Sequence, residues 1–226
     1  MKKIFVILLM LCLFGCTEKK STEVKMTTEE EVLSVAINYV VDLRKEFVGK
    51  VELLYIENSI LSTIVYYNKD RYLNIIPTDL LKNYLNSFEK YGKNLRDDKT
   101  EELLKNLELN YKYVKKDAST CIRNWYKDNG IDRSDITRYE KEKHNLFKKC
   151  SINKPSITIA HAPAFNDEKD LALVEVGFFY SEGELSDPQK PYLSGTSVIV
   201  LRKIRGQWAV IFQDDMYFGE KVLGPS

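Results

Sequence analysis

The stretch that decides the fold is 170–181, which reads DLALVEVGFFYS. Successive side chains of a strand point to opposite faces of a sheet, and this stretch alternates in that way. One face carries Ala172, Val174, Val176, Phe178 and Tyr180. The other carries Leu173, Glu175, Gly177 and Phe179. We therefore expect a strand over 170–181, within a β-rich C-terminal region.

Further strands are expected around this one, over 157–162, 195–203 and 207–213. Arg205 and Gly206 separate two apolar segments, 198–204 and 208–212, in the manner of a hairpin turn. A hairpin makes its two strands antiparallel neighbours. The economical architecture is a twisted meander with helices on one side.

Helix signals precede this region. Thr27 or Thr28 can cap a helix through a glutamate three residues further on, and apolar side chains then recur at helical spacing as far as Phe47. Two more helices are expected over 78–92 and from Asp98 to about 107. Between the first two helices, 51–56 is a strand candidate, and 60–67 is either its partner strand or a short helix.

These elements predict the α+β class, with N-terminal helices packed on a curved antiparallel sheet and a C-terminal β-meander. No repeat or linker rich in proline, serine or glycine divides the chain. We expect residues 1–15 to be a signal peptide, 16–27 a tether that starts at a lipidated cysteine, and 28–226 one globular domain.

A run of motifs in the last quarter of the chain carries a resemblance. The motifs are PAFN at 163–166, ALVEVG at 172–177, SG at 194–195, VLRK at 200–203 and GQW at 206–208. They resemble the C-terminal meander of many uncharacterised bacterial envelope lipoproteins. Related curved sheets occur in the nuclear-transport-factor-two-like fold, where a sheet and helices enclose a pocket. The resemblance implies a shape and no activity.

The N-terminus has the order of a secretory signal. Lys2 and Lys3 precede the apolar run 4–13, which is shorter than the roughly 20 residues that span a bilayer as a helix. Leu13, Gly15 and Cys16 then resemble the lipobox of bacterial lipoproteins. That resemblance implies cleavage before Cys16, a diacylglycerol thioether on its sulfur, and further acylation such as palmitate. The alternative is an ordinary secretory signal with a coincidental cysteine.

Charge gives no reason to expect nucleic acid or anionic lipid as a partner. The chain has 34 basic and 33 acidic side chains, and cleavage after residue 15 would remove Lys2 and Lys3. A net charge near zero offers no basic surface for phosphate, so the lipid would supply the membrane attachment. Thr17 follows Cys16 where some inner-membrane lipoproteins have Asp. This favours the outer membrane, if the host has one.

Four cysteines are present, of which Cys12 lies in the signal and Cys16 would carry lipid. Cys121 and Cys150 remain, and in an oxidising compartment we expect them to form a disulfide. The bridge would close a loop of about 30 residues and add about 3 to 4 kcal/mol. The alternative is two separate buried thiols. No metal site and no cofactor is expected.

Catalytic motifs are absent: the chain has no nucleophile elbow, phosphate-binding loop or paired-cysteine zinc pattern. One acid–base pair is worth testing, between His161 at the end of a strand and Asp214 or Asp215 after the last strand. The simpler interpretation is a surface histidine and a solvated acidic turn. The loop 181–194 is long enough for a binding loop, with a plain solvated loop as the alternative.

Together these observations predict a lipid-anchored cell-envelope protein that acts as a binding or structural module, with another envelope protein as partner. Lipoproteins of this size also serve as immunity factors against envelope toxins. The competing hypothesis is a small pocket enzyme of the nuclear-transport-factor-two-like type, with His161 and Asp214 or Asp215 in its pocket.

Overall fold

A computed structural model of the chain describes residues 25–58, 62–66, 69–92, 98–115, 155–181 and 192–221. The signal, Cys16, and the expected disulfide between Cys121 and Cys150 lie outside the described residues. So does most of the expected binding loop, over 182–191.

Helices and strands are both present, which confirms the α+β class. The helices are α2 (Thr28–Leu43), α3 (Lys45–Val48), α4 (Thr63–Tyr66), α5 (Lys69–Tyr72), α6 (Thr78–Gly92) and α7 (Asp98–Leu103). The strands are β1 (Leu53–Asn58), β2 (Lys112–Lys115), β3 (Ser156–Ile159), β4 (Ala164–Phe165), β5 (Leu171–Ser181), β6 (Tyr192–Ile204) and β7 (Gln207–Lys221).

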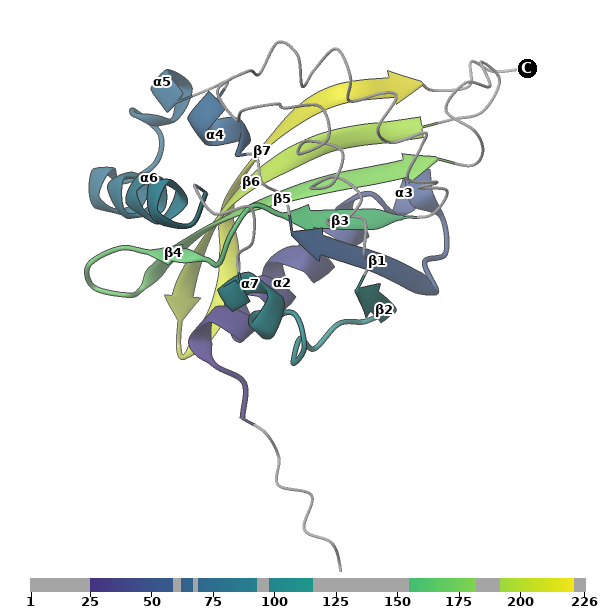
Figure 1. Cartoon of the computed structure of the whole chain (residues 1–226), viewed down its shortest axis with the longest axis horizontal. Coiled ribbons are helices and arrows are strands. Elements are labelled where there is room, and N and C mark those ends of the chain that lie inside the picture. Colours follow the sequence, from purple (N-terminus) through teal and green to yellow (C-terminus); the bar gives the residue numbers. More distant parts are fainter. Residues whose placement is uncertain are drawn as a thin grey trace, which may run out of the picture.

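Within the described ranges, seven strands form one mixed sheet in the order β2-β1-β3-β5-β6-β7, with β4 paired to β5 (Figure 1). The C-terminal meander is confirmed, because β3, β5, β6 and β7 are successive antiparallel neighbours. Arg205 and Gly206 form the expected hairpin turn, and both have positive φ, 51° and 86°. Positive φ at two central residues matches the right-handed twist of the flanking strands.

The other half of the sheet differs from the expectation of an antiparallel sheet. Strand β1 runs parallel to both β2 and β3. The segment after β1 forms the short helix α4 and does not pair with β1 as a strand. Two parallel neighbours must be joined by a long crossover connection. The apolar segments of this sequence are short, and their pattern does not indicate which strands such connections join.

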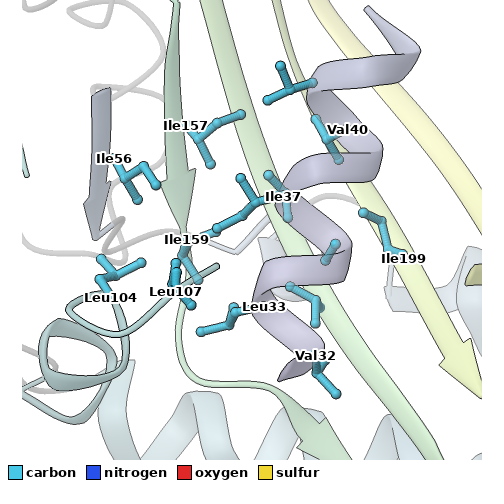
Figure 2. Close-up of a cluster of buried hydrophobic side chains, with 14 of the residues drawn as sticks. Val32, Leu33, Ile37, Val40, Ile56, Leu104, Leu107, Ile157, Ile159 and Ile199 are labelled. Atoms are coloured by element: carbon cyan, nitrogen blue, oxygen red, sulfur yellow. The ribbon is translucent and has the colours of Figure 1, made fainter. Parts of the chain in front are cut away.

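Both faces of the sheet are covered, not one. The even-numbered side chains of β5, such as Val174 and Val176, pack under α2, together with Ile37 of that helix. Figure 2 shows α2 directing Leu33, Ile37 and Val40 at the strands. On the opposite face, Leu173 packs with Tyr84 of α6 and with residues of α4 and α5. The two-sided apolar pattern of β5 therefore reflects a strand between two cores.

Helix α2 begins where the sequence predicted, with Thr27 as its N-cap. The Thr27 hydroxyl accepts the Glu30 N–H at 3.3 Å, and a Glu30 carboxylate oxygen accepts the Thr27 N–H at 2.6 Å. Burial alone would raise the pKa of Glu30, but hydrogen bonds from Thr27 and Asn106 hold this pKa below its ordinary value. The capping box fixes the N-terminal end of α2, which is the end nearer to Cys16 in the sequence.

Candidate functional site

A buried carboxylate lies at the centre of the α6 face of the sheet. Glu175, on β5, is 4% exposed and accepts hydrogen bonds from the Ser62 hydroxyl at 2.7 Å and the Tyr84 hydroxyl at 2.6 Å. The Thr63 N–H donates to its second oxygen. Burial and the adjacent Glu175 raise the pKa of Tyr84 well above its ordinary value, so this hydroxyl keeps its proton. Through these hydrogen bonds Glu175 connects β5 to the start of α4 and to the middle of α6.

His161 lies beside this cluster and is 4% exposed, so the expectation of a surface histidine is wrong. Its ring centroid is 4.5 Å from that of Tyr84 and 5.9 Å from that of Phe88. Its Nδ1 contacts the carbonyl oxygen of Ala162, which can only accept, so Nδ1 carries the proton. Both of these rings belong to α6, so His161 lies against that helix.

The acid–base pair considered from the sequence does not form. Ile159 of β3, Val176 of β5, Ser197 of β6 and Asp215 of β7 lie in one row across the sheet. Three strand spacings separate the outer two by about 14 Å. His161 follows Ile159 by two residues, so two strands lie between it and the acidic pair.

Asp214 and Asp215 occupy opposite faces of β7 and are not a solvated turn. Asp214 accepts hydrogen bonds from Tyr72 and Arg71, both at 2.6 Å. Asp215 forms an ion pair with Arg44 at 2.8 Å and accepts the Ser197 hydroxyl at 2.6 Å. Asp214 is therefore held by α5, and Asp215 by the C-cap residue of α2 and by β6.

The second buried polar cluster is centred on Arg44, which is 6% exposed at the end of α2. Its guanidinium donates to Ser197 at 3.0 Å and lies 3.8 Å from the ring centroid of Phe178. Burial alone would raise the pKa of Asp215, but hydrogen bonds from Ser197 and Gln213 and the charge of Arg44 hold this pKa below its ordinary value. A cavity of about 20 Å³, the space of a single water, adjoins the cluster.

A cleft of about 650 Å³ lies at the other end of α2. Three segments form its walls: the start of α2, residues 108–110, and the turn between β6 and β7 up to Trp208. Its volume lies in the range of about 300 to 1,000 Å³ that is typical of ligand sites. The cleft mixes apolar side chains with the carboxylates of Glu31 and Glu108.

Two side chains of α2, four residues apart, form hydrogen bonds to residues 108–110, which make up one wall of this cleft. The Ser34 hydroxyl accepts the Glu108 N–H at 3.0 Å. The Asn38 side chain accepts the Asn110 N–H at 3.0 Å and donates to the Glu108 carbonyl oxygen at 3.1 Å. Side chains at i and i+4 share one helix face, so both reach the same segment. The spacing between α2 and residues 108–110 is thus set by three hydrogen bonds.

Comparison with protein-family models, with curated proteins and with solved structures finds no match for this chain. Across the described ranges, no group of three or more His, Cys, Asp or Glu side chains is placed to hold a metal ion. Among the helices described, none has the length and apolar character to cross a membrane.

Sequence reasoning did not identify the buried Glu175 cluster or the cleft, although the sequence contains one signal of the cluster. Glu175 is the lone charged residue inside the apolar strand 171–181, which marks an acid that needs buried partners. Its partners Ser62 and Tyr84 stand 113 and 91 residues away, and no local pattern connects them. The cleft likewise draws on three distant segments.

Proposed function

We propose that this protein is a lipid-anchored protein of the bacterial cell envelope whose domain acts by binding. The observation that carries the proposal is the N-terminal order of Lys2 and Lys3, the apolar run 4–13, and a lipobox that ends at Cys16. In a host with two membranes, Thr17 after the lipidated cysteine favours the outer one.

The position of the cleft supports a binding role close to the membrane surface. Met26, which lines the cleft, follows Cys16 by ten residues. Even a fully extended chain of that length spans at most about 35 Å. The cleft would therefore face molecules at or near the membrane, while the buried clusters of Glu175 and Arg44 hold the domain together.

Intact mass and detergent partitioning of the native protein test the anchor. We expect the wild type to carry acyl mass on a chain that begins at Cys16 and to enter the detergent phase. Cys16→Ser should lose both properties, because serine lacks the thiol that accepts the diacylglycerol. Cys12→Ser is the matched control and should behave as wild type, since residue 12 leaves with the signal. Release of the wild type without lipid would contradict the proposal.

A further inference from the structure

We propose that the cleft at the start of α2 binds a lysine or arginine side chain that a protein partner in the envelope presents. This inference rests on the binding role proposed above and adds the chemistry of the partner. Three features of the cleft carry it: the charge of its walls, its apolar surface, and its fixed width.

Among the residues that the structure describes, the charge of the cleft is acidic and uncompensated. Glu31 and Glu108 line it, and neither carboxylate has a hydrogen-bond or ion-pair partner within the described residues. The adjacent acids differ, because Glu29 pairs with Lys99 and Glu30 with Thr27 and Asn106. The described residues that line it include no lysine, arginine or histidine. Two free carboxylates facing one hollow favour a cation and repel phosphate and anionic lipid.

The rest of the surface suits the aliphatic stem of a basic side chain. Val35, Leu109 and Trp208 supply apolar wall. Long basic side chains lay their methylene groups on apolar surface while the charged end reaches a polar partner. Trp208 is 7% exposed, and its indole N–H has no acceptor among the described residues. That N–H is itself buried, so Trp208 offers an incoming chain its apolar ring and not a hydrogen bond.

The width of the cleft does not depend on the ligand. Ser34 is 5% exposed, and with Asn38 it ties residues 108–110 to α2 through three hydrogen bonds. The backbone of Glu108 is therefore held beside α2, the helix that carries Glu31, before anything binds. Preorganised walls spare a ligand the ordering that a mobile site would require. About 650 Å³ also leaves room for residues flanking the basic side chain.

Calorimetric titration of the full-length protein at low salt tests the proposal, with the peptides acetyl-Lys-Leu-Lys-amide and acetyl-Glu-Leu-Glu-amide as probes. We expect binding of the cationic peptide alone, with an affinity that falls as salt is added. E31Q/E108Q should lower the association constant at least tenfold. The control E46Q/E89Q removes two exposed charges elsewhere and should stay within twofold of wild type.

Fluorescence locates the binding site. Trp125→Phe leaves Trp208 as the single tryptophan, and the cationic peptide should change its emission with the same midpoint as the calorimetric curve. Equal losses in the two double variants, no loss in E31Q/E108Q, or equally tight binding of spermidine would each overturn the proposal. Every cleft residue lies at or after Met26, so the titration gives its answer whether or not Cys16 carries lipid.

Discussion

Glu175 and Asp215 are acids on opposite faces of the same sheet, and the protein stabilises them by different means. Asp215, under the end of α2, pairs with the buried cation of Arg44 and also accepts the Ser197 hydroxyl. Glu175, under α6, accepts hydrogen bonds from two hydroxyls and one backbone N–H, without a cation among these partners. One cluster joins two charges, whereas the other surrounds one carboxyl group with neutral donors.

The difference teaches how each face holds its helices. Arg44 joins α2 to β6 and β7 through a strong but single ionic contact. Glu175 collects donors from two separate segments, the start of α4 and the middle of α6, so its loss would release both. Buried donors without an acceptor are more unfavourable than a missing hydrogen bond between exposed groups. We therefore expect the α6 face to be the more sensitive of the two.

Removal of the Glu175 carboxyl group should have the largest effect. Glu175→Ala leaves the Thr63 N–H without its acceptor, and the Ser62 and Tyr84 hydroxyls, 2.9 Å apart, can then bond only to each other, so one of them also lacks an acceptor. We expect a loss of about 4 kcal/mol in the free energy of unfolding. Glu175→Gln keeps one acceptor oxygen and should lose about half as much. Urea unfolding at pH 7 measures both. A loss below about 1 kcal/mol for Glu175→Ala would show that the cluster does not hold α4 and α6.

Removal of the cation on the other face should have the second largest effect. Arg44→Met leaves Asp215 without its ionic partner, and a broken buried pair is destabilising by about 3 kcal/mol. The control is Arg71→Met, whose partner Asp214 sits at 2.6 Å but whose own side chain is 50% exposed. An exposed pair contributes about 1 kcal/mol or less.

The double variant R44M/D215L sharpens this test, because it removes both charges and leaves none unpaired. It should recover more than half of the stability that Arg44→Met loses, as measured by the same urea unfolding. Equal losses in Arg44→Met and Arg71→Met would argue that the buried Arg44 pair behaves like a surface contact.

Sequence reasoning reached the features whose determinants are local. The capping box of Thr27 and Glu30, the two faces of β5 and the turn at Arg205 and Gly206 each occupy a few consecutive residues. It failed where partners are distant. The parallel pairing of β1 with β2 and β3 depends on crossovers, and the strand β2 is only four residues long.

The candidate site was the least predictable part for the same reason. His161 and the pair Asp214 and Asp215 were singled out by chemical type, but the sheet order places β5 and β6 between them. The cleft depends on which segment packs against α2, and two polar side chains, Ser34 and Asn38, contribute hydrogen bonds to that packing. In a sequence, polar residues on a helix are usually interpreted as a solvent-exposed face. Here Ser34 and Asn38 form hydrogen bonds with the backbone of residues 108–110.

Acid should lower the stability that the Arg44 and Asp215 cluster contributes. We expect this effect to be the smallest of the three, because Asp215 stays ionised, and the stability unchanged, until the pH falls into the acidic range. The pKa of Asp215 lies below its ordinary value of 3.8 in the folded protein, so the unfolded chain binds the proton first as pH falls. The stability that Asp215 contributes is thus complete above its unfolded pKa and is lost as pH falls through the folded pKa. Urea midpoints at pH 7, 5, 4 and 3 measure this loss.

The variant Asp215→Asn is the control. Its urea midpoint should be lower than that of wild type at pH 7 and should fall less between pH 7 and pH 3. Glu30, whose pKa is also lowered, keeps its own contribution in that variant, so some pH dependence remains. Equal slopes in wild type and Asp215→Asn would mean that the ion pair with Arg44 adds nothing to folding, and the contrast between the two faces would then rest on Glu175 alone.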